Sequence, residues 1–386
     1  MRFSSAFAAL SLFVATSLSA PTALHTVETF DGETTGRHIV TLKEGVSKAS
    51  LIAQIKQNAT ITHEFDIING FAGHLDEDTL NALRANPDVE LIAEDGIMHT
   101  MVTQTNAPWG ISRVSSTARL SNQNTGISAL TFTYTYDAAA GSGVDIFIVD
   151  TGILTTHTQF GGRARWGATF GGYADRDGNG HGTHCAGTAA GSQFGVAKSA
   201  NLVAVKVLSD AGSGAVTDIV SGLNFVASSA TRPTVASMSL GGGASTSLDN
   251  AVAALTRAGV HVTVAAGNDG ADAGSTSPAR APSANTVGAT TIADARASFS
   301  NFGSVVDIFA PGQNIISAWS TSNTATNNIS GTSMATPHIA GLIAYLISVR
   351  GNTSPAAMTS LLQSLSQKGV ISGIPGGTIN DFAHNA

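Results

Sequence analysis

Three short motifs of the chain carry side chains that together suit acyl transfer. Such chemistry at neutral pH needs a hydroxyl nucleophile, a base that takes its proton, and an acid that orients the base. Asp150 stands in the motif VDTG, His181 opens HGTHCAG, and Ser333 lies in GTSMATPH. The chain therefore offers an acid, a base and a nucleophile in the order Asp, His, Ser.

The segments around these motifs predict an α/β fold with a mostly parallel sheet flanked by helices. Strands that are apolar throughout and alternate with helices are typical of a parallel sheet covered on both faces. Active sites in such sheets lie at the carboxyl ends of the strands, where the three motifs fall. The apolar runs are 144–149, 202–208, 235–240 and 260–265, and the helical patterns are 216–229, 246–258 and 333–349.

Composition excludes several other classes of protein. Of the 386 residues, 42% are hydrophobic and 12% are charged, which is ample for a core and unlike a disordered chain. No run of about 18 apolar residues marks a membrane span, and the net charge of −7 argues against nucleic-acid binding. The single cysteine, Cys185, excludes an intrachain disulfide framework. Nothing in the pattern indicates an obligate oligomer, so we expect a monomer.

Charge divides the chain into two segments. Residues 1–101 hold 6 Lys and Arg against 13 Asp and Glu, whereas residues 102–386 hold 13 basic and 13 acidic residues and no Glu. Such different compositions predict two structural units with different roles in the protein. At the start, Arg2, an apolar run at 7–14 and small residues up to Ala20 predict a secretory signal peptide over residues 1–19. We therefore expect an extracellular protein.

The segment from residue 20 to residue 101 has the pattern of a small α+β unit. It predicts a strand at 38–42, a helix at 46–57, an extended stretch at 65–75 that is either one strand or two with the bend at Gly70, a helix at 76–86 and a strand at 89–93. A helix-on-sheet unit of about 60 residues is marginal by itself. This unit therefore needs a partner to fold against.

With these motifs in view, the chain resembles the subtilisin-like serine proteases, and within them the proteinase K group with its secreted fungal alkaline proteases. The three motifs match, as does QTNAPWG at residues 104–110, and the resemblance covers essentially the whole chain. It implies a secreted serine endopeptidase in which Ser333 is the nucleophile, His181 the base and Asp150 its orienting partner. Asn268, in AAGND, matches the family's oxyanion donor. Ser333 opens a helix, whose positive end favours an oxyanion nearby.

The resemblance also implies how such an enzyme is made. Residues 20–101 match an inhibitory propeptide with a ferredoxin-like fold, which serves as intramolecular chaperone and inhibitor. Residues 102–386 match the subtilisin-like catalytic domain. Alignment of residues 104–110 with the family's mature start puts the activating cut between Met101 and Val102. An apolar residue before the cut suits self-processing.

In the family, protein and peptide substrates lie as an extended strand between two enzyme segments. These match Gly212, Ser213 and Gly214 on one side and Ser239, Leu240 and Gly241 on the other. Backbone hydrogen bonds accept any sequence, so we expect broad specificity. The side chain before the cut bond would lie between residues 239–241 and the segment of Ala265, Ala266 and Gly267, whose small residues leave a roomy apolar pocket. Selecting Lys or Arg would need a buried carboxylate, which these segments lack, so we expect a preference for aromatic or large aliphatic residues.

A structural calcium ion is implied by the same resemblance. Asp307, with the backbone carbonyls of Pro282 and Ala284, matches the family's strong calcium site. Oxygen ligands of this kind suit Ca²⁺. Without the resemblance, one loop carboxylate would indicate no more than a solvated side chain.

Three alternatives stay open at this point. A lipase or esterase would use GxSxG and the order Ser, Asp, His, whereas here Ala335 replaces the last Gly and the order is reversed. Cys185 lies four residues after His181, on the same face of a helix, and could be a nucleophile in its own right. A catalytically dead homologue could act as a binding protein, although the triad positions and Asn268 are all filled.

Overall fold

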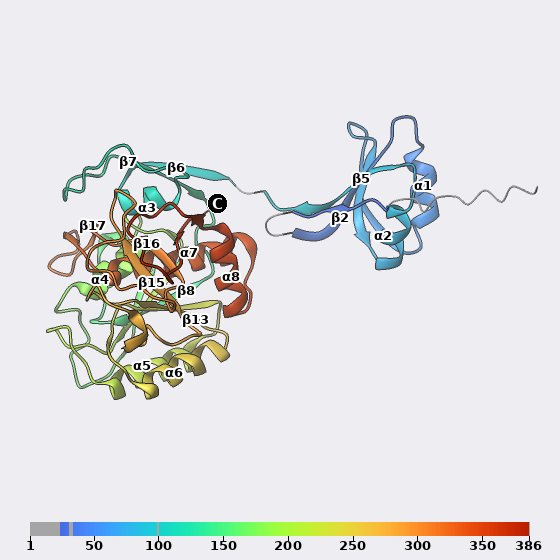
Figure 1. Ribbon diagram of the computed structural model, residues 1–386. Helices are drawn as coiled ribbons and strands as arrows, with labels where there is room; N and C mark the ends of the chain where they lie inside the picture. The colour runs from blue at the N-terminus through green and yellow to red at the C-terminus, as the bar shows by residue number, and fades with distance from the viewer. Residues whose placement is uncertain (1–23, 31–33, 99, 386) are drawn as a thin grey trace, which may run out of the picture. The chain divides into compact units, whose positions relative to one another are not determined.

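The computed structural model describes residues 24–30, 34–98 and 100–385 (Figure 1). The chain forms two compact units that divide between Ile97 and Met98. This division lies close to the predicted boundary after Met101, and the cut itself stays a prediction. The predicted signal peptide, residues 1–19, lies outside the described residues.

The first unit is a five-stranded sheet with two helices. Its strand order is β1-β5-β2-β4-β3, with β1 parallel to β5 and the other pairs antiparallel. Side chains of both helices share one apolar core with the sheet. From β2 to β5 the βαββαβ order is the expected ferredoxin-like one. The elements are β1 (Val27–Glu28), β2 (Thr34–Leu42), α1 (Lys48–Ile55), β3 (Ala59–Phe65), β4 (Gly70–Leu75), α2 (Glu77–Arg84) and β5 (Val89–Gly96).

The extended stretch predicted at 65–75 differs in detail from the structure. The turn precedes Gly70, and Asn69 in that turn has a φ of 37°. Gly70 itself starts β4, where an added Cβ would lie 2.4 Å from the carbonyl oxygen of Val40. Sequence reasoning missed β3 because it is an edge strand whose side chains are mostly exposed, so its apolar pattern is weak.

The second unit is built on a nine-stranded sheet of order β19-β20-β16-β15-β13-β11-β8-β10-β9. Neighbouring strands are parallel except for β19 and β20. The prediction of a mostly parallel sheet is therefore confirmed. The strands are β8 (Asp145–Asp150), β9 (Ala164–Thr169), β10 (Asn201–Lys206), β11 (Thr234–Met238), β13 (His261–Ala265), β15 (Asn285–Thr290), β16 (Ile308–Pro311), β19 (Gln367–Lys368) and β20 (Asp381–Phe382).

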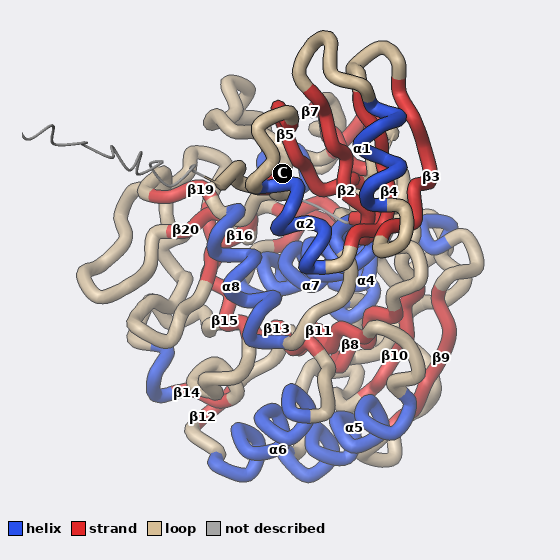
Figure 2. The backbone as a smooth tube through the Cα atoms, turned by 90° about the vertical axis from the view of Figure 1, so that its right-hand side faces the viewer, coloured by secondary structure: helices blue, strands red, loops and turns tan. Residues whose placement is uncertain are grey.

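Helices cover both faces of this sheet (Figure 1, Figure 2). α4 (His181–Ala190), α7 (Thr332–Arg350) and α8 (Pro355–Leu365) pack on one face. α5 (Val216–Ser229) and α6 (Thr246–Arg257) pack on the other. Successive residues of β8 belong to the two different cores, which explains why the strand is apolar throughout.

The central helix, α7, has the length of a membrane span. Among the described residues it is the one helix that is long and apolar enough to cross a membrane by length and composition. However, 83% of its most apolar stretch is buried inside the domain. It packs there against β11, β13 and β15 and therefore forms the centre of the core.

Shorter elements complete the second unit. The predicted cut between Met101 and Val102 falls inside β6, opposite Asp137 and Tyr136 of β7. The elements are β6 (Met101–Ala107), α3 (Trp109–Val114), β7 (Phe132–Asp137), β12 (Gly242–Gly243), β14 (Thr276–Ser277), β17 (Ile315–Ala318), β18 (Thr326–Ile329) and the 3₁₀ turns Thr158–Phe160 and Ala273–Ser275.

Candidate active site

The sheet topology brings the predicted catalytic residues to one edge. Asp150 is the last residue of β8, His181 is the first of α4, and Ser333 is the second of α7. Asn268 lies in the loop that follows β13. Residues at the carboxyl ends of parallel strands, and at the starts of the helices that follow, meet at the same edge of the sheet.

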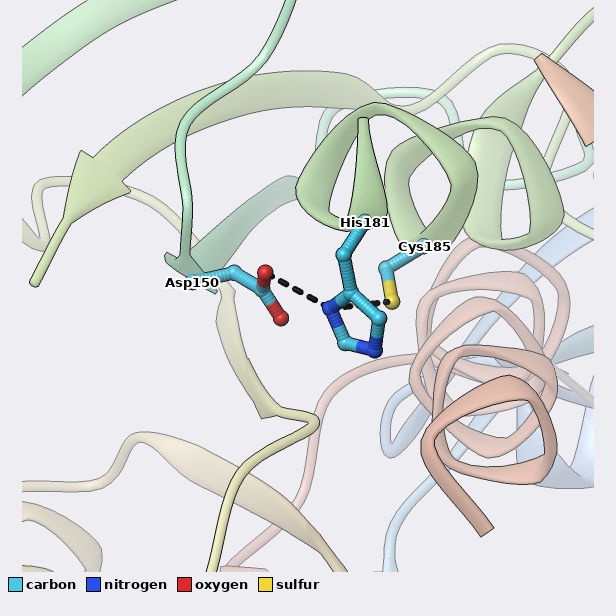
Figure 3. A group of neighbouring side chains, drawn as sticks. All are labelled: Asp150, His181 and Cys185. Carbon is cyan, nitrogen blue, oxygen red and sulfur yellow. Dashed lines mark hydrogen bonds and ion pairs between the residues drawn. The ribbon is translucent and has the colours of Figure 1, made fainter. Parts of the chain in front are cut away.

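Asp150 and His181 form a close pair. Nδ1 of His181 lies 2.8 Å from Oδ1 of Asp150 (Figure 3), and the Thr151 N–H donates to the same oxygen at 2.7 Å. Asp150 is fully buried, and its Oδ2 has no hydrogen-bond partner among the described residues. Burial opposes protonation of His181, but the negative charge of Asp150, the hydrogen bond to Asp150 and the contact with Cys185 together outweigh it and hold the pKa of His181 well above its usual value.

Ser333 is tied to the end of β11 by two reciprocal hydrogen bonds. Its Oγ donates to the carbonyl of Ser239 at 3.2 Å, and Oγ of Ser239 donates to the carbonyl of Ser333 at 2.8 Å. Ser333 and His181 line the same cleft. The hydroxyl of Ser333 thus points to Ser239. Because catalytic hydrogen bonds are often long or misaligned until substrate binds, this orientation is compatible with a nucleophilic role for Ser333.

The side chain of Asn268 is oriented by the residue before Ser333. Oδ1 of Asn268 accepts from the N–H of Thr332 at 2.8 Å and from its Oγ1 at 3.0 Å. Since the acceptor oxygen is occupied, the Nδ2 donors remain for the cleft that Asn268 lines. Sequence reasoning missed Thr332, although it lies inside the GTSMATPH motif.

The cleft has a volume of about 850 Å³, within the range of about 300–1,000 Å³ typical of ligand sites. Ala266, in contrast to the other predicted binding residues, is fully buried in a separate apolar cluster and does not line it. The predicted residues that do line it are Gly212, Ser213, Gly214, Ser239, Leu240, Gly241, Ala265 and Gly267.

One carboxylate in the cleft lining was missed. Asp269 lines the cleft and is exposed. The predicted pocket segments, which end at Gly267, contain no acidic residue, but the cleft lining extends beyond them to Asp269. Water and salt screen an exposed charge, so Asp269 is no equivalent of the buried carboxylate that strong selection for Lys or Arg requires.

Cys185 lies beside the pair but is not suited to be a nucleophile. Its Sγ is 3.9 Å from Nδ1 of His181 (Figure 3). The same Sγ donates to the carbonyl of Ser333 at 3.5 Å. Burial raises the pKa of the thiol, whereas a reactive cysteine needs a lowered one. Among the described residues, Asp150, His181 and Cys185 are the one group of three His, Cys, Asp or Glu side chains spaced closely enough for a metal ion. However, His181 and Asp150 are in direct hydrogen-bond contact at 2.8 Å, so their closeness is also explained by that hydrogen bond.

The residues matched to a calcium site, Asp307, Pro282 and Ala284, do not line the cleft. Oδ2 of Asp307 accepts from the N–H of Thr286 at 2.8 Å, two residues after Ala284. Burial raises the pKa of Asp307 to about 6, and no cationic side chain contributes to that shift. Ser283, between Pro282 and Ala284, has a buried Oγ without a partner among the described residues. A mostly buried carboxylate that no cationic side chain among the described residues stabilises fits a cation site.

Comparison with known proteins decides which family has this arrangement. The sequence pattern of the subtilase family matches residues 141–376, more than half of the chain. The chain belongs to the subtilase family. Residues 37–101 of this subtilase match the peptidase inhibitor I9 family, which agrees with the predicted propeptide. The alternative of a lipase or esterase is therefore wrong.

Similar proteins cover nearly the whole subtilase. A cuticle-degrading protease of Metarhizium anisopliae is 45% identical over 359 residues, covering 90% of this chain and 89% of that protein. Proteinase R of Parengyodontium album is 48% identical over 357 residues, covering 90% and 88%. The crystal structure of a cold-adapted subtilisin-like serine proteinase matches with a TM-score of 0.68 at 45% identity, covering 73% of this chain and 99% of that one. The subtilase is thus a serine protease with an I9 propeptide.

Proposed function

We propose that this subtilase is an endopeptidase that cleaves peptide bonds through an acyl-enzyme on Ser333. The observation that carries the proposal is the pairing of His181 with the buried Asp150 beside a cleft that Ser333 also lines. His181 takes the proton of Ser333 Oγ as this oxygen attacks the substrate carbonyl carbon, and Asn268 donates a hydrogen bond to the resulting oxyanion. His181 then gives the proton to the leaving amine, and water releases the acyl group by the same route.

Broad specificity with a preference for large apolar or aromatic residues before the cut bond is the second part of the proposal. Small residues leave space in the cleft, while the side chains of Leu208, Ile219 and Leu248 add apolar surface to its lining. Asp269 is the acidic side chain that this lining presents. Because Asp269 is exposed, it adds a weak attraction for cationic side chains and does not reverse the preference.

The enzyme is made, in this proposal, as a secreted zymogen that processes itself. Residues 1–19 direct secretion, residues 20–101 act as chaperone and inhibitor, and the cut after Met101 releases residues 102–386. The match of residues 37–101 to an inhibitor family supports the second of these roles. A calcium ion held by the Asp307 carboxylate and the carbonyls of Pro282 and Ala284 would stabilise the catalytic domain without entering the reaction.

Comparison of the wild-type enzyme with Ser333→Ala tests the proposal. Activity is measured on casein and on peptides that differ only in the residue before the cut bond, with and without phenylmethylsulfonyl fluoride. We expect Ser333→Ala to lower kcat on the order of 10⁶-fold, as found for the nucleophile of subtilisin, and to accumulate as uncut precursor. Ser330→Ala is the matched control, because Ser330 is exposed and three residues away.

Each other outcome has a definite meaning. Activity retained by Ser333→Ala would show that another group is the nucleophile. A correctly processed wild type without activity would favour a dead homologue. Faster cleavage after Arg than after Phe or Leu would overturn the proposed preference. Normal processing of the Ser333→Ala chain in a host without other proteases would overturn self-processing.

A further inference from the structure

Asp177 is a buried carboxylate that the mechanism above leaves unused. It lies in the loop between β9 and α4, and only 8% of its surface is exposed. A buried carboxylate is costly unless several donors bind it. The hydrogen bonds of Asp177 come from neutral donors on three separate segments, which raises the question of what this arrangement holds in place.

Both carboxylate oxygens are fully engaged. Oδ1 accepts from Thr151 Oγ1 at 2.9 Å, from the Gly180 N–H at 2.8 Å and from the Asn179 N–H at 3.1 Å. Oδ2 accepts from the Thr183 N–H at 2.9 Å and from Thr183 Oγ1 at 2.6 Å. The carboxylate thus joins the end of β8, its own loop and the first turn of α4.

The two threonines it binds are the neighbours of the catalytic pair. Thr151 follows Asp150 and donates its N–H to the Asp150 carboxylate at 2.7 Å. Thr183 lies two residues after His181 in the first turn of α4. Thr151 Oγ1 also accepts from the Gly182 N–H at 2.9 Å, so strand and helix are joined directly as well. Movement of either threonine would change the contact between His181 and Asp150.

The start of α4 depends on this carboxylate for a second reason. The N-cap residue of α4 is Gly180, which offers no side-chain acceptor to the free N–H groups of the first turn. The side chains of Asn179, Thr151 and Asp177 accept instead from the N–H groups of His181, Gly182 and Thr183. A negative charge at this end also complements the helix dipole.

We propose that Asp177 is a positioning residue that fixes His181 relative to Asp150 by clamping Thr151 and Thr183 at once. The proposal rests on the proposed function, since it assigns Asp177 a task in that same site. A displacement of about 1 Å in a catalytic contact can cost on the order of 10²-fold in rate. Asp177 therefore acts on catalysis without touching substrate.

Replacement by an amide of equal size tests this inference. Asp177→Asn removes the charge and places an N–H₂ group against donors, so we expect kcat to fall on the order of 10²-fold and KM to stay within about twofold. Rates are expressed per active site, counted with a fluorophosphonate label. Asp175→Asn is the matched control, because Asp175 is an exposed carboxylate of the same loop that accepts from Thr169 Oγ1. We expect this control variant to keep normal activity.

A second pair of variants keeps the inference testable if Asp177→Asn does not fold. Thr183→Val removes the hydroxyl that donates to the carboxylate, whereas Thr183→Ser retains it. We expect the valine variant to lower kcat about tenfold, which corresponds to a loss of about 1.4 kcal/mol in transition-state stabilisation. The serine variant should restore kcat to near the wild-type value.

A kcat per labelled site that is unchanged in Asp177→Asn or Thr183→Val would overturn the inference, even if the melting temperature or the yield fell. That result would make Asp177 a purely structural residue. Failure of the proposed function is distinguishable, because it would appear as activity retained by Ser333→Ala.

Discussion

At the scale of single residues, we expect the pairing of Asp150 with His181 to set the acid limit of activity. In the proposed mechanism, only the neutral imidazole can take the proton of Ser333. Because the pKa of His181 is held well above its usual value, we expect kcat/KM to fall on the acid side with a midpoint above about 6.5. Asp150→Asn should move that midpoint downward and lower kcat on the order of 10⁴-fold. The measurement is the pH profile of kcat/KM for one peptide with both enzymes.

The raised pKa of His181 should affect fold stability in the opposite direction from activity: it lowers activity in acid, but it stabilises the fold there. A raised folded-state pKa of His181 stabilises the fold below about pH 6.5, and this contribution is lost as pH rises through the folded pKa. Loss of activity in mild acid is therefore not unfolding caused by His181, and circular dichroism at each pH provides the control. A profile whose midpoint is the same with and without the Asp150 charge would contradict this account.

The residues that sequence could and could not predict differ in a physical way. Asp150, His181, Ser333 and Asn268 stand in long local motifs, so their types and order are visible without a structure. The proposed role of Asp177 depends on its contacts with Thr183, which is near in sequence, and with Thr151, which is 26 residues away and which no local pattern reveals. The HGTHCAG motif beside Asp177 was visible in the sequence, but the role of Asp177 depends on which loop folds over which strand.

At the scale of elements, a buried ion pair anchors the short helix α3. Arg113 is fully buried, and its Nε and Nη2 lie 2.9 and 3.1 Å from the two carboxylate oxygens of Asp294. Nη2 also donates to Gln367 of β19 at 2.9 Å. An isolated helix of this length is not stable in water. Arg113 therefore connects the start of the catalytic domain to the segment after β15 through Asp294 and to the C-terminal strand β19 through Gln367.

Breaking this pair should destabilise the catalytic domain strongly. We expect Arg113→Met and Asp294→Asn each to cost about 3–5 kcal/mol, because each leaves a buried charge without its partner. The double variant should cost less than the sum. Chemical unfolding of the inhibitor-blocked mature enzyme measures the free energy of unfolding of each variant. Arg176→Met is the control, because the side chain of Arg176 is 72% exposed. Additive losses, or single losses no larger than that of Arg176→Met, would show that the pair does not couple these elements.

How well the sequence predicted each element depended on how the side chains of that element are buried. The helical pattern at 216–229 has the bounds of α5, because that helix has one buried and one solvated face. The buried strands β8, β10, β11 and β13 were found within two residues at each end. The edge strand β9 has mostly half-buried side chains, and β19 and β20 have two residues each, so their sequences carry no clear period. Their strand character comes from the neighbours they pair with.

At the scale of the whole molecule, the question is what stabilises a catalytic domain without disulfides. Cys185 is the only cysteine of the chain, so packing and the proposed calcium ion must supply the stability. We expect a chelator to lower the melting temperature at pH 8 by several degrees. An ion at 100 times its Kd adds about 2.7 kcal/mol, and about 1 kcal/mol corresponds to 2–4 °C in a domain of about this size. Scanning calorimetry of inhibitor-blocked enzyme separates unfolding from autolysis.

The calcium effect should also depend on pH in a specific direction. Without the ion, the pKa of Asp307 is raised to about 6, so ionising this carboxylate costs stability as pH rises from about 4 to about 6. Calcium must displace that proton, and its stabilisation should therefore be largest above pH 6 and fade below it. Asp307→Asn should abolish the response while leaving the metal-free protein at least as stable as wild type at pH 8, and Asp175→Asn should respond normally. A wild-type melting temperature indifferent to chelation at pH 8, or a normal response in Asp307→Asn, would remove calcium from this site.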